Sequence, residues 1–79
     1  MAFYVVILKQ SEDHSAVIYS FGSTEEKLGL LQLEKESGNV KELEPVPEKN
    51  SESLFARAAV KVRQHWREGL YPEETCWAS

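Results

Sequence analysis

The sequence predicts an α+β domain: an antiparallel four-stranded meander sheet, one long C-terminal helix packed on one face, and a docked C-terminal tail. Three observations support this prediction. Short runs rich in aromatic and β-branched residues, separated by polar turns, are typical of strands. One later segment repeats apolar residues at three- and four-residue spacing, which is typical of an amphipathic helix. Since 79 residues are enough for one domain, we assign residues 1–79 to a single unit.

The first two strands are predicted at residues 3–8 and 16–21. A polar turn at residues 11–15 separates them, and Gly22 ends the second, so they are expected to form a hairpin. Both alternating sets of side chains in residues 3–8 are apolar. A strand of this kind is typically central and covered on both faces.

Residues 24–36 fit either a strand or a helix. Ser23 followed by Glu26 resembles a helix capping box, and several good helix formers come next. Against the helix, Gly29 would lie inside it and cost about 1 kcal/mol. We favour a β-strand in a second hairpin and keep the helix as the alternative.

The register of this second hairpin stays open. A two-residue turn within residues 37–40 would create the opposite-charge pairs Lys35–Glu42 and Glu36–Lys41. The same register sets Leu43 opposite Glu34, a mismatch that a one-residue bulge would correct. Prolines at positions 45 and 47 then predict an edge strand or a strand that leaves the sheet there.

The helix is predicted over residues 50–68, with Asn50 or Ser51 as the N-terminal cap and Gly69 as the C-terminal cap. Its apolar stripe consists of Phe55, Ala58, Ala59, Val62 and Trp66. The tail that follows carries Leu70, Tyr71 and Trp77. A free tail rarely carries three large apolar side chains, so we expect it to dock on the domain.

Two stretches, LGLLQLEKESGNVKELEPVP (residues 28–47) and HWREGLYPEETCWAS (residues 65–79), resemble a group of short uncharacterised bacterial proteins with no assigned activity. The resemblance covers most of the chain. It supports a hairpin followed by a helix. It contains no motif of known mechanism, so it implies nothing about chemistry.

Composition and charge narrow the classes of partner. Lys plus Arg number 9 and Asp plus Glu number 13, a formal net charge of −4. An acidic balance argues against nucleic acid and against an anionic membrane surface. The first apolar run is too short to span a bilayer and lacks the features of a signal peptide. A single cysteine excludes an internal disulfide, so a cytoplasmic location is expected.

No group of residues points to catalysis, a cofactor or a metal. Cys76, His14 and His65 are the only thiol and imidazole groups, and nothing in the sequence brings a base to the thiol. The chain has no Cys-x-x-Cys or His-x-x-x-His spacing for zinc, and its glycines are scattered rather than grouped in a phosphate loop. We expect no enzyme, no cofactor and no metal site, and we rank an enzyme or cofactor binder as the last alternative.

The strongest functional prediction comes from the predicted sheet, which has two apolar faces and only one helix to cover them. One helix covers one face of a sheet, yet the first strand is apolar on both, so either the tail or a second protein chain must cover the other. We therefore predict a small protein-interaction domain, a homodimer or a subunit that docks on a larger protein. The predicted contact residues are Tyr4, Val6, Leu8, Arg57, Lys61, Arg63, Arg67, Tyr71 and Trp77.

A small RNA-binding domain is the first alternative. Residues 50–68 carry four cations and two anions, a net charge of +2, while the rest of the chain has a net charge of −6. The basic helix could hold phosphates, with Trp66 or Tyr71 stacking on bases. A set of glutamates on or beside the second hairpin could instead meet a basic protein partner, including the basic helix of another copy. The set consists of Glu34, Glu36, Glu42 and Glu44, with Glu25 and Glu26 nearby.

Overall fold

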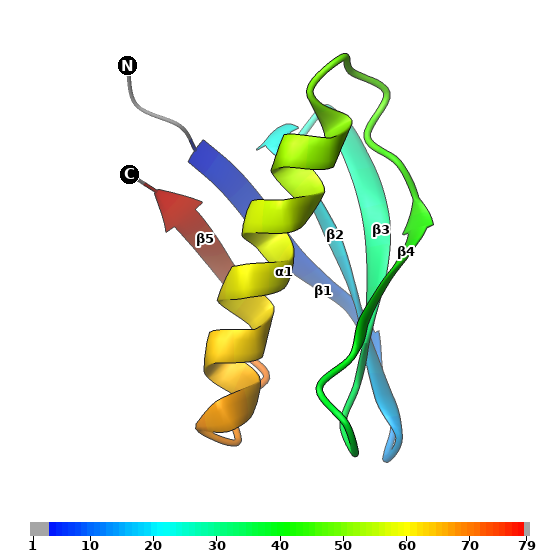
Figure 1. Ribbon diagram of the computed structural model, residues 1–79, viewed down its shortest axis with the longest axis vertical. Helices are drawn as coiled ribbons and strands as arrows, with labels where there is room; N and C mark the ends of the chain where they lie inside the picture. Colours follow the sequence, from blue (N-terminus) through cyan, green and yellow to red (C-terminus); the bar gives the residue numbers. More distant parts are fainter. Residues whose placement is uncertain (1–3, 79) are drawn as a thin grey trace.

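A computed structural model describes residues 4–78 and confirms the α+β class. The elements are β1 (Tyr4–Glu12), β2 (Ala16–Thr24), β3 (Lys27–Glu34), β4 (Val40–Glu44), α1 (Ser51–Arg67) and β5 (Glu74–Ala78). The strands form one antiparallel sheet in the order β4-β3-β2-β1-β5, and α1 lies across one face of it (Figure 1). The predicted meander is its first four strands. Phe3, the predicted start of the first strand, lies outside the described residues.

The tail docks, as expected, but as a fifth strand that the sequence analysis did not predict. β5 pairs antiparallel with β1, from Tyr4 opposite Ala78 to Leu8 opposite Glu74. The Lys9 amide donates to the Glu73 carbonyl at 2.8 Å and continues this pairing. A meander alone would leave β1 at an edge, so the tail satisfies backbone groups that β1 would otherwise expose. The tail therefore widens the sheet and does not cover its second face.

Residues 27–34 form β3, so the hairpin prediction is confirmed and the helix alternative is wrong. The register, which the sequence left open, is fixed by the structure: β4 starts at Val40 opposite Leu33, so the pairs Lys35–Glu42 and Glu36–Lys41 considered for a two-residue turn do not form. The connection between β3 and β4 is longer than a two-residue turn, because β3 ends at Glu34 and β4 begins at Val40. The Gly38 amide donates to the Glu34 carbonyl at 2.8 Å, and Gly38 has a φ of 78°.

β4 is an edge strand that ends before the first proline, as predicted. A bulge does occur, but away from Glu34: it lies between Leu30 and Leu31 of β3, where the pairing shifts from Glu44 to Glu42. The shift leaves Leu43 unpaired in the ladder and 42% exposed. The mismatch of Leu43 with Glu34 does not arise, because Leu33 pairs with Val40 and Leu43 lies at the other end of β4.

The helix runs within the predicted bounds, and its end is fixed by a Schellman motif. Gly69, with a φ of 74°, donates its amide to the Trp66 carbonyl, and the Leu70 amide donates to the His65 carbonyl, both at 2.9 Å. At the other end Asn50 is the cap residue but makes no side-chain capping bond. The Ser51 hydroxyl instead accepts the Val46 amide at 3.0 Å, which ties the helix start to the loop before it.

The core lies between α1 and the sheet. Three helix residues are fully buried, Leu54, Ala58 and Val62, and the predicted stripe missed the first of them. Their neighbours from the sheet and the loop before α1 are Val5, Ile7, Val17, Tyr19, Phe21, Leu31 and Val46. Trp66 lies at the border of the stripe and is half-buried. Its indole N–H donates to the Lys35 carbonyl at 2.7 Å.

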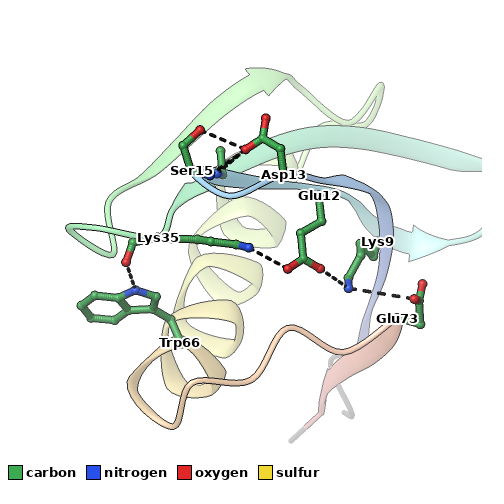
Figure 2. A network of polar contacts seen from close by, with 8 residues as sticks. Lys9, Glu12, Asp13, Ser15, Lys35, Trp66 and Glu73 are labelled. Atoms are coloured by element: carbon green, nitrogen blue, oxygen red, sulfur yellow. Dashed lines mark hydrogen bonds and ion pairs between the residues drawn. The ribbon is translucent and has the colours of Figure 1, made fainter.

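Polar contacts connect the end of β1, the start of β2 and the loop after β3 (Figure 2). Glu12 accepts hydrogen bonds from Lys35 at 2.7 Å and from Lys9 at 2.6 Å, and these bonds, Lys35 first, lower the pKa of Glu12. In the adjacent turn the backbone amides of Ser15 and Ala16 donate to Asp13 and lower the pKa of its carboxyl group. The network fixes the β1–β2 turn against the β3–β4 loop.

Candidate functional site

The two faces of the sheet have different surroundings. On β1, Val5 and Ile7 point toward α1 and are 0% exposed, whereas Tyr4, Val6 and Leu8 point the other way. Within residues 4–78, α1 is the one helix, and no strand or helix lies over the second face (Figure 1). We call this second face the open face. By strand register its apolar side chains are those of Tyr4, Val6, Leu8, Ile18, Leu28, Leu30 and Cys76.

A shallow depression of about 290 Å³ lies at the β1–β5 end of the open face. Tyr4, Val6 and Leu8, all three predicted as contact residues, line it together with Cys76 of β5. Cys76 is directly opposite Val6 in the strand pairing. The structure therefore brings the predicted strand residues to one concave surface.

Two carboxylates give this depression a negative charge. Glu25, from the β2–β3 turn, and Glu74, from β5, are both exposed and both line it. Among residues 4–78 neither is in an ion pair, and no Lys or Arg lines the depression. The Cys76 thiol beside the phenol raises the pKa of Tyr4, and the charges of Glu25 and Glu74 add to this effect. An apolar surface with unneutralised carboxylates favours a cationic partner.

Sequence reasoning missed Glu74 and Cys76 as members of this surface, and it grouped Glu25 with the glutamates of the second hairpin and not with β1. The period-two pattern of residues 74–78 would have placed Glu74 and Cys76 on one face, had that segment been recognised as a strand. Glu25 carries no comparable signal, because only the packing of the β2–β3 turn brings it near β1.

The two tail aromatics lie on the opposite face from Tyr4, Val6 and Leu8. Trp77 packs against the core beneath α1, and the Arg57 guanidinium lies 5.1 Å from the centre of its ring. Tyr71 also packs against the core, with the Lys35 ammonium 4.7 Å from its ring centre. Both contribute to the fold, so the nine predicted contact residues do not form one surface.

The predicted basic side chains of α1 divide into two groups. Arg57 and Lys61 are half-buried toward the rest of the molecule. Arg63 and Arg67 are exposed on the outer side of the helix. Val60 lies near them and is 49% exposed, an apolar residue on that side which the sequence analysis did not consider.

Within residues 4–78, the thiol and the two imidazole groups lie in different parts of the structure. The His65 ring nitrogen Nε2 lies 3.0 Å from the Thr75 hydroxyl on the α1 side of the sheet, whereas Cys76 points to the open face. His14 lies in the β1–β2 turn, beside a second depression of about 670 Å³ lined mainly by polar and charged loop residues. Within residues 4–78, no group of three or more His, Cys, Asp or Glu side chains could hold a metal ion. Nor is the helix in that range long and apolar enough to cross a membrane.

No protein-family model matches the chain, and comparison with curated proteins and with solved structures finds no match. The geometry of the molecule is therefore the basis for assigning a function. Its distinctive feature is the open face with the acidic, apolar depression.

Proposed function

We propose that the protein is a non-catalytic protein-interaction module that binds its partner with the open face of the sheet. One observation carries the proposal: β1 is an internal strand with apolar side chains on both faces, and α1 covers only one of them. The two longer dimensions of the molecule are 34 and 23 Å. A face of that size is comparable to the roughly 800 Å² that each partner contributes to a standard protein interface.

The charges on the open face specify the chemistry of the partner. Glu25 and Glu74 would be neutralised by Lys or Arg, and the surface formed by Tyr4, Val6 and Leu8 would take an apolar side chain. The partner is therefore a protein surface that presents an apolar side chain flanked by cations. We place this interaction in the cytoplasm, because one free cysteine is common in reducing compartments.

The RNA-binding alternative is less well supported. Its stacking residues would be Trp66 and Tyr71, and both are engaged in the fold. The Trp66 ring packs against Gly38 so closely that an added Cβ there would lie 2.6 Å from it. The Tyr71 ring is occupied by the Lys35 ammonium. The basic helix therefore lacks the free aromatic faces that single-stranded RNA recognition uses.

The test is a binding measurement on a purified partner. A tagged protein is used to capture partners from the source cell, and the candidate is then purified and titrated by calorimetry. We expect Leu8→Lys on the open face to weaken binding about tenfold or more. Leu43→Lys is the matched control, because Leu43 is also an accessible leucine but lies at the β4 edge.

Circular dichroism shows whether each variant is folded before it is titrated. If Leu8→Lys is unfolded, Glu25→Lys with Glu74→Lys takes its place, because both glutamates are exposed. A partner that binds the open-face variants and wild type equally well would contradict the proposal. So would a protein that captures nothing and is monomeric on its own.

A further inference from the structure

The surface that fits the depression is present on the chain itself. Resting on the function proposed above, we infer that the partner is a second copy of this protein, which docks the outer side of its α1 into the depression of the first. The docking surface on α1 is here called the outer stripe and consists of Ala56, Val60, Arg63 and Arg67. The depression contributes Tyr4, Val6, Leu8, Glu25 and Glu74.

The outer stripe points away from the core. Its residues recur at three- and four-residue spacing, on the side of α1 opposite the buried Leu54, Ala58 and Val62. Val60 is 49% exposed, and both arginines are exposed. Among residues 4–78 no ion pair holds Arg63 or Arg67. The stripe thus presents an apolar side chain beside two available guanidinium groups.

The two surfaces are complementary in both hydrophobicity and charge. Val60 matches the apolar lining of the depression, and the small Ala56 allows the helix backbone to approach closely. Arg63 and Arg67 are four residues apart, so their Cβ atoms lie about 6 Å from each other on one side of the helix. They can pair with Glu25 and Glu74, because a guanidinium binds a carboxylate through two parallel hydrogen bonds.

The position of the two surfaces determines the symmetry of the assembly. α1 lies on one side of the sheet (Figure 1), and the outer stripe faces away from the sheet, whereas the residues that line the depression point to the other side of the sheet by strand register. A contact between two different surfaces is heterologous, so each copy retains one unused stripe or depression. The copies therefore associate head to tail, into a closed ring or an extending chain, and not into the symmetric dimer that face-to-face packing of two open faces would give.

Two variants at exposed positions test this inference by complementation. The depression variant is Glu25→Lys with Glu74→Lys, and the stripe variant is Val60→Lys. Analytical ultracentrifugation at low salt should show concentration-dependent assembly of the wild type, which weakens as salt screens the ion pairs. Each variant alone should assemble at least about tenfold more weakly. An equimolar mixture should form a complex of two chains and no larger species, since one intact stripe meets one intact depression.

The control and the alternative outcomes separate this inference from the function proposed above. Glu42→Lys with Glu44→Lys makes the same change of charge at the β4 edge and should assemble like the wild type. A stripe variant that still dimerises by itself would overturn head-to-tail docking in favour of face-to-face packing. A wild type that is monomeric at the highest concentration would also overturn it. A monomer that captures a different protein through the open face would still support the proposed interaction module.

Discussion

The two faces of the sheet are built from alternate residues of the same strands, yet they have different roles. On the covered face, Val5, Ile7 and Leu31 are 0% exposed and meet α1 or its neighbours. On the open face, Val6, Leu8 and Leu30 remain partly exposed, and Tyr4 is 49% exposed. The difference shows that an apolar strand in a small domain need not serve folding on both sides. The covered face stabilises the fold, and the open face is the surface that we propose binds a partner.

The largest expected effect is a difference in the free energy of unfolding between Leu31→Ala and Leu30→Ala. These variants truncate neighbouring leucines of β3 that point to opposite faces. Leu31→Ala leaves a cavity in the core and should lower the free energy of unfolding by about 4 kcal/mol. Leu30→Ala removes a side chain that is already partly in water and should cost about 1 kcal/mol or less. Urea denaturation of both variants checks the difference. Equal losses would mean that the open face is covered in solution, either by a second copy or by an altered packing.

A smaller effect is expected at the two glycines with positive φ. Gly38→Ala would add a Cβ 2.6 Å from the Trp66 ring, in addition to the cost of the left-handed conformation, and should destabilise the protein by about 3 kcal/mol. Gly69→Ala carries only the conformational cost, because nothing lies within 4 Å of its Cβ position, and should lose about 1 kcal/mol. Thermal unfolding of the two variants measures the gap. A similar loss for both would show that Trp66 does not pack on the β3–β4 loop.

The smallest effect is on the pH dependence of stability, to which Tyr19 on the covered face should contribute more than Tyr4 on the open face. Burial raises the pKa of Tyr19 on the covered face to about 12, whereas a tyrosine in the unfolded chain ionises near about 10. The neutral phenol therefore stabilises the folded state, fully below about pH 10, and this contribution of about 2 kcal/mol is lost as the pH rises toward about 12. Tyr19→Phe should flatten this alkaline loss of stability, measured by urea denaturation across that range.

Tyr4→Phe is the control for this titration. Tyr4 lies on the open face, where half of its side chain is in water, so its removal should change the alkaline slope less than Tyr19→Phe does. If the slopes of the two variants are the same, the covered face does not shield Tyr19 from solvent.

Particular elements show why sequence reasoning succeeded or failed. The first hairpin and α1 were predicted as elements because their patterns repeat within a few residues, but β1 and β2 extend to Glu12 and Thr24, beyond the predicted ends at residues 8 and 21. The strand at residues 27–34 was left ambiguous, since Leu28, Leu30, Leu31 and Leu33 fit neither period cleanly. The register of β4 stayed open at the level of sequence, because the loop before it packs around Trp66, 28 positions beyond Gly38.

The candidate site was predicted in part. Alternation along one strand is a local property, so the sequence grouped Tyr4, Val6 and Leu8 on one face, and the structure shows that this is the face that α1 leaves uncovered. Tyr71 and Trp77 were grouped with them, but the pairing of β5 with β1 turns Trp77 toward the helix side. The acidic members Glu25 and Glu74 come from a turn and from β5, and no local pattern connects them to β1.

The sequence by itself determined the strands of the meander, the helix with its glycine stop, and the two apolar sides of β1. These features depend on hydrophobic periodicity and on backbone preferences that act over a few residues. Only the tertiary structure decided where the tail docks, how β4 is aligned and which carboxylates lie beside the depression. Each of these depends on contacts between distant parts of the chain, and such contacts are selected by packing and by the satisfaction of backbone hydrogen bonds across the whole fold.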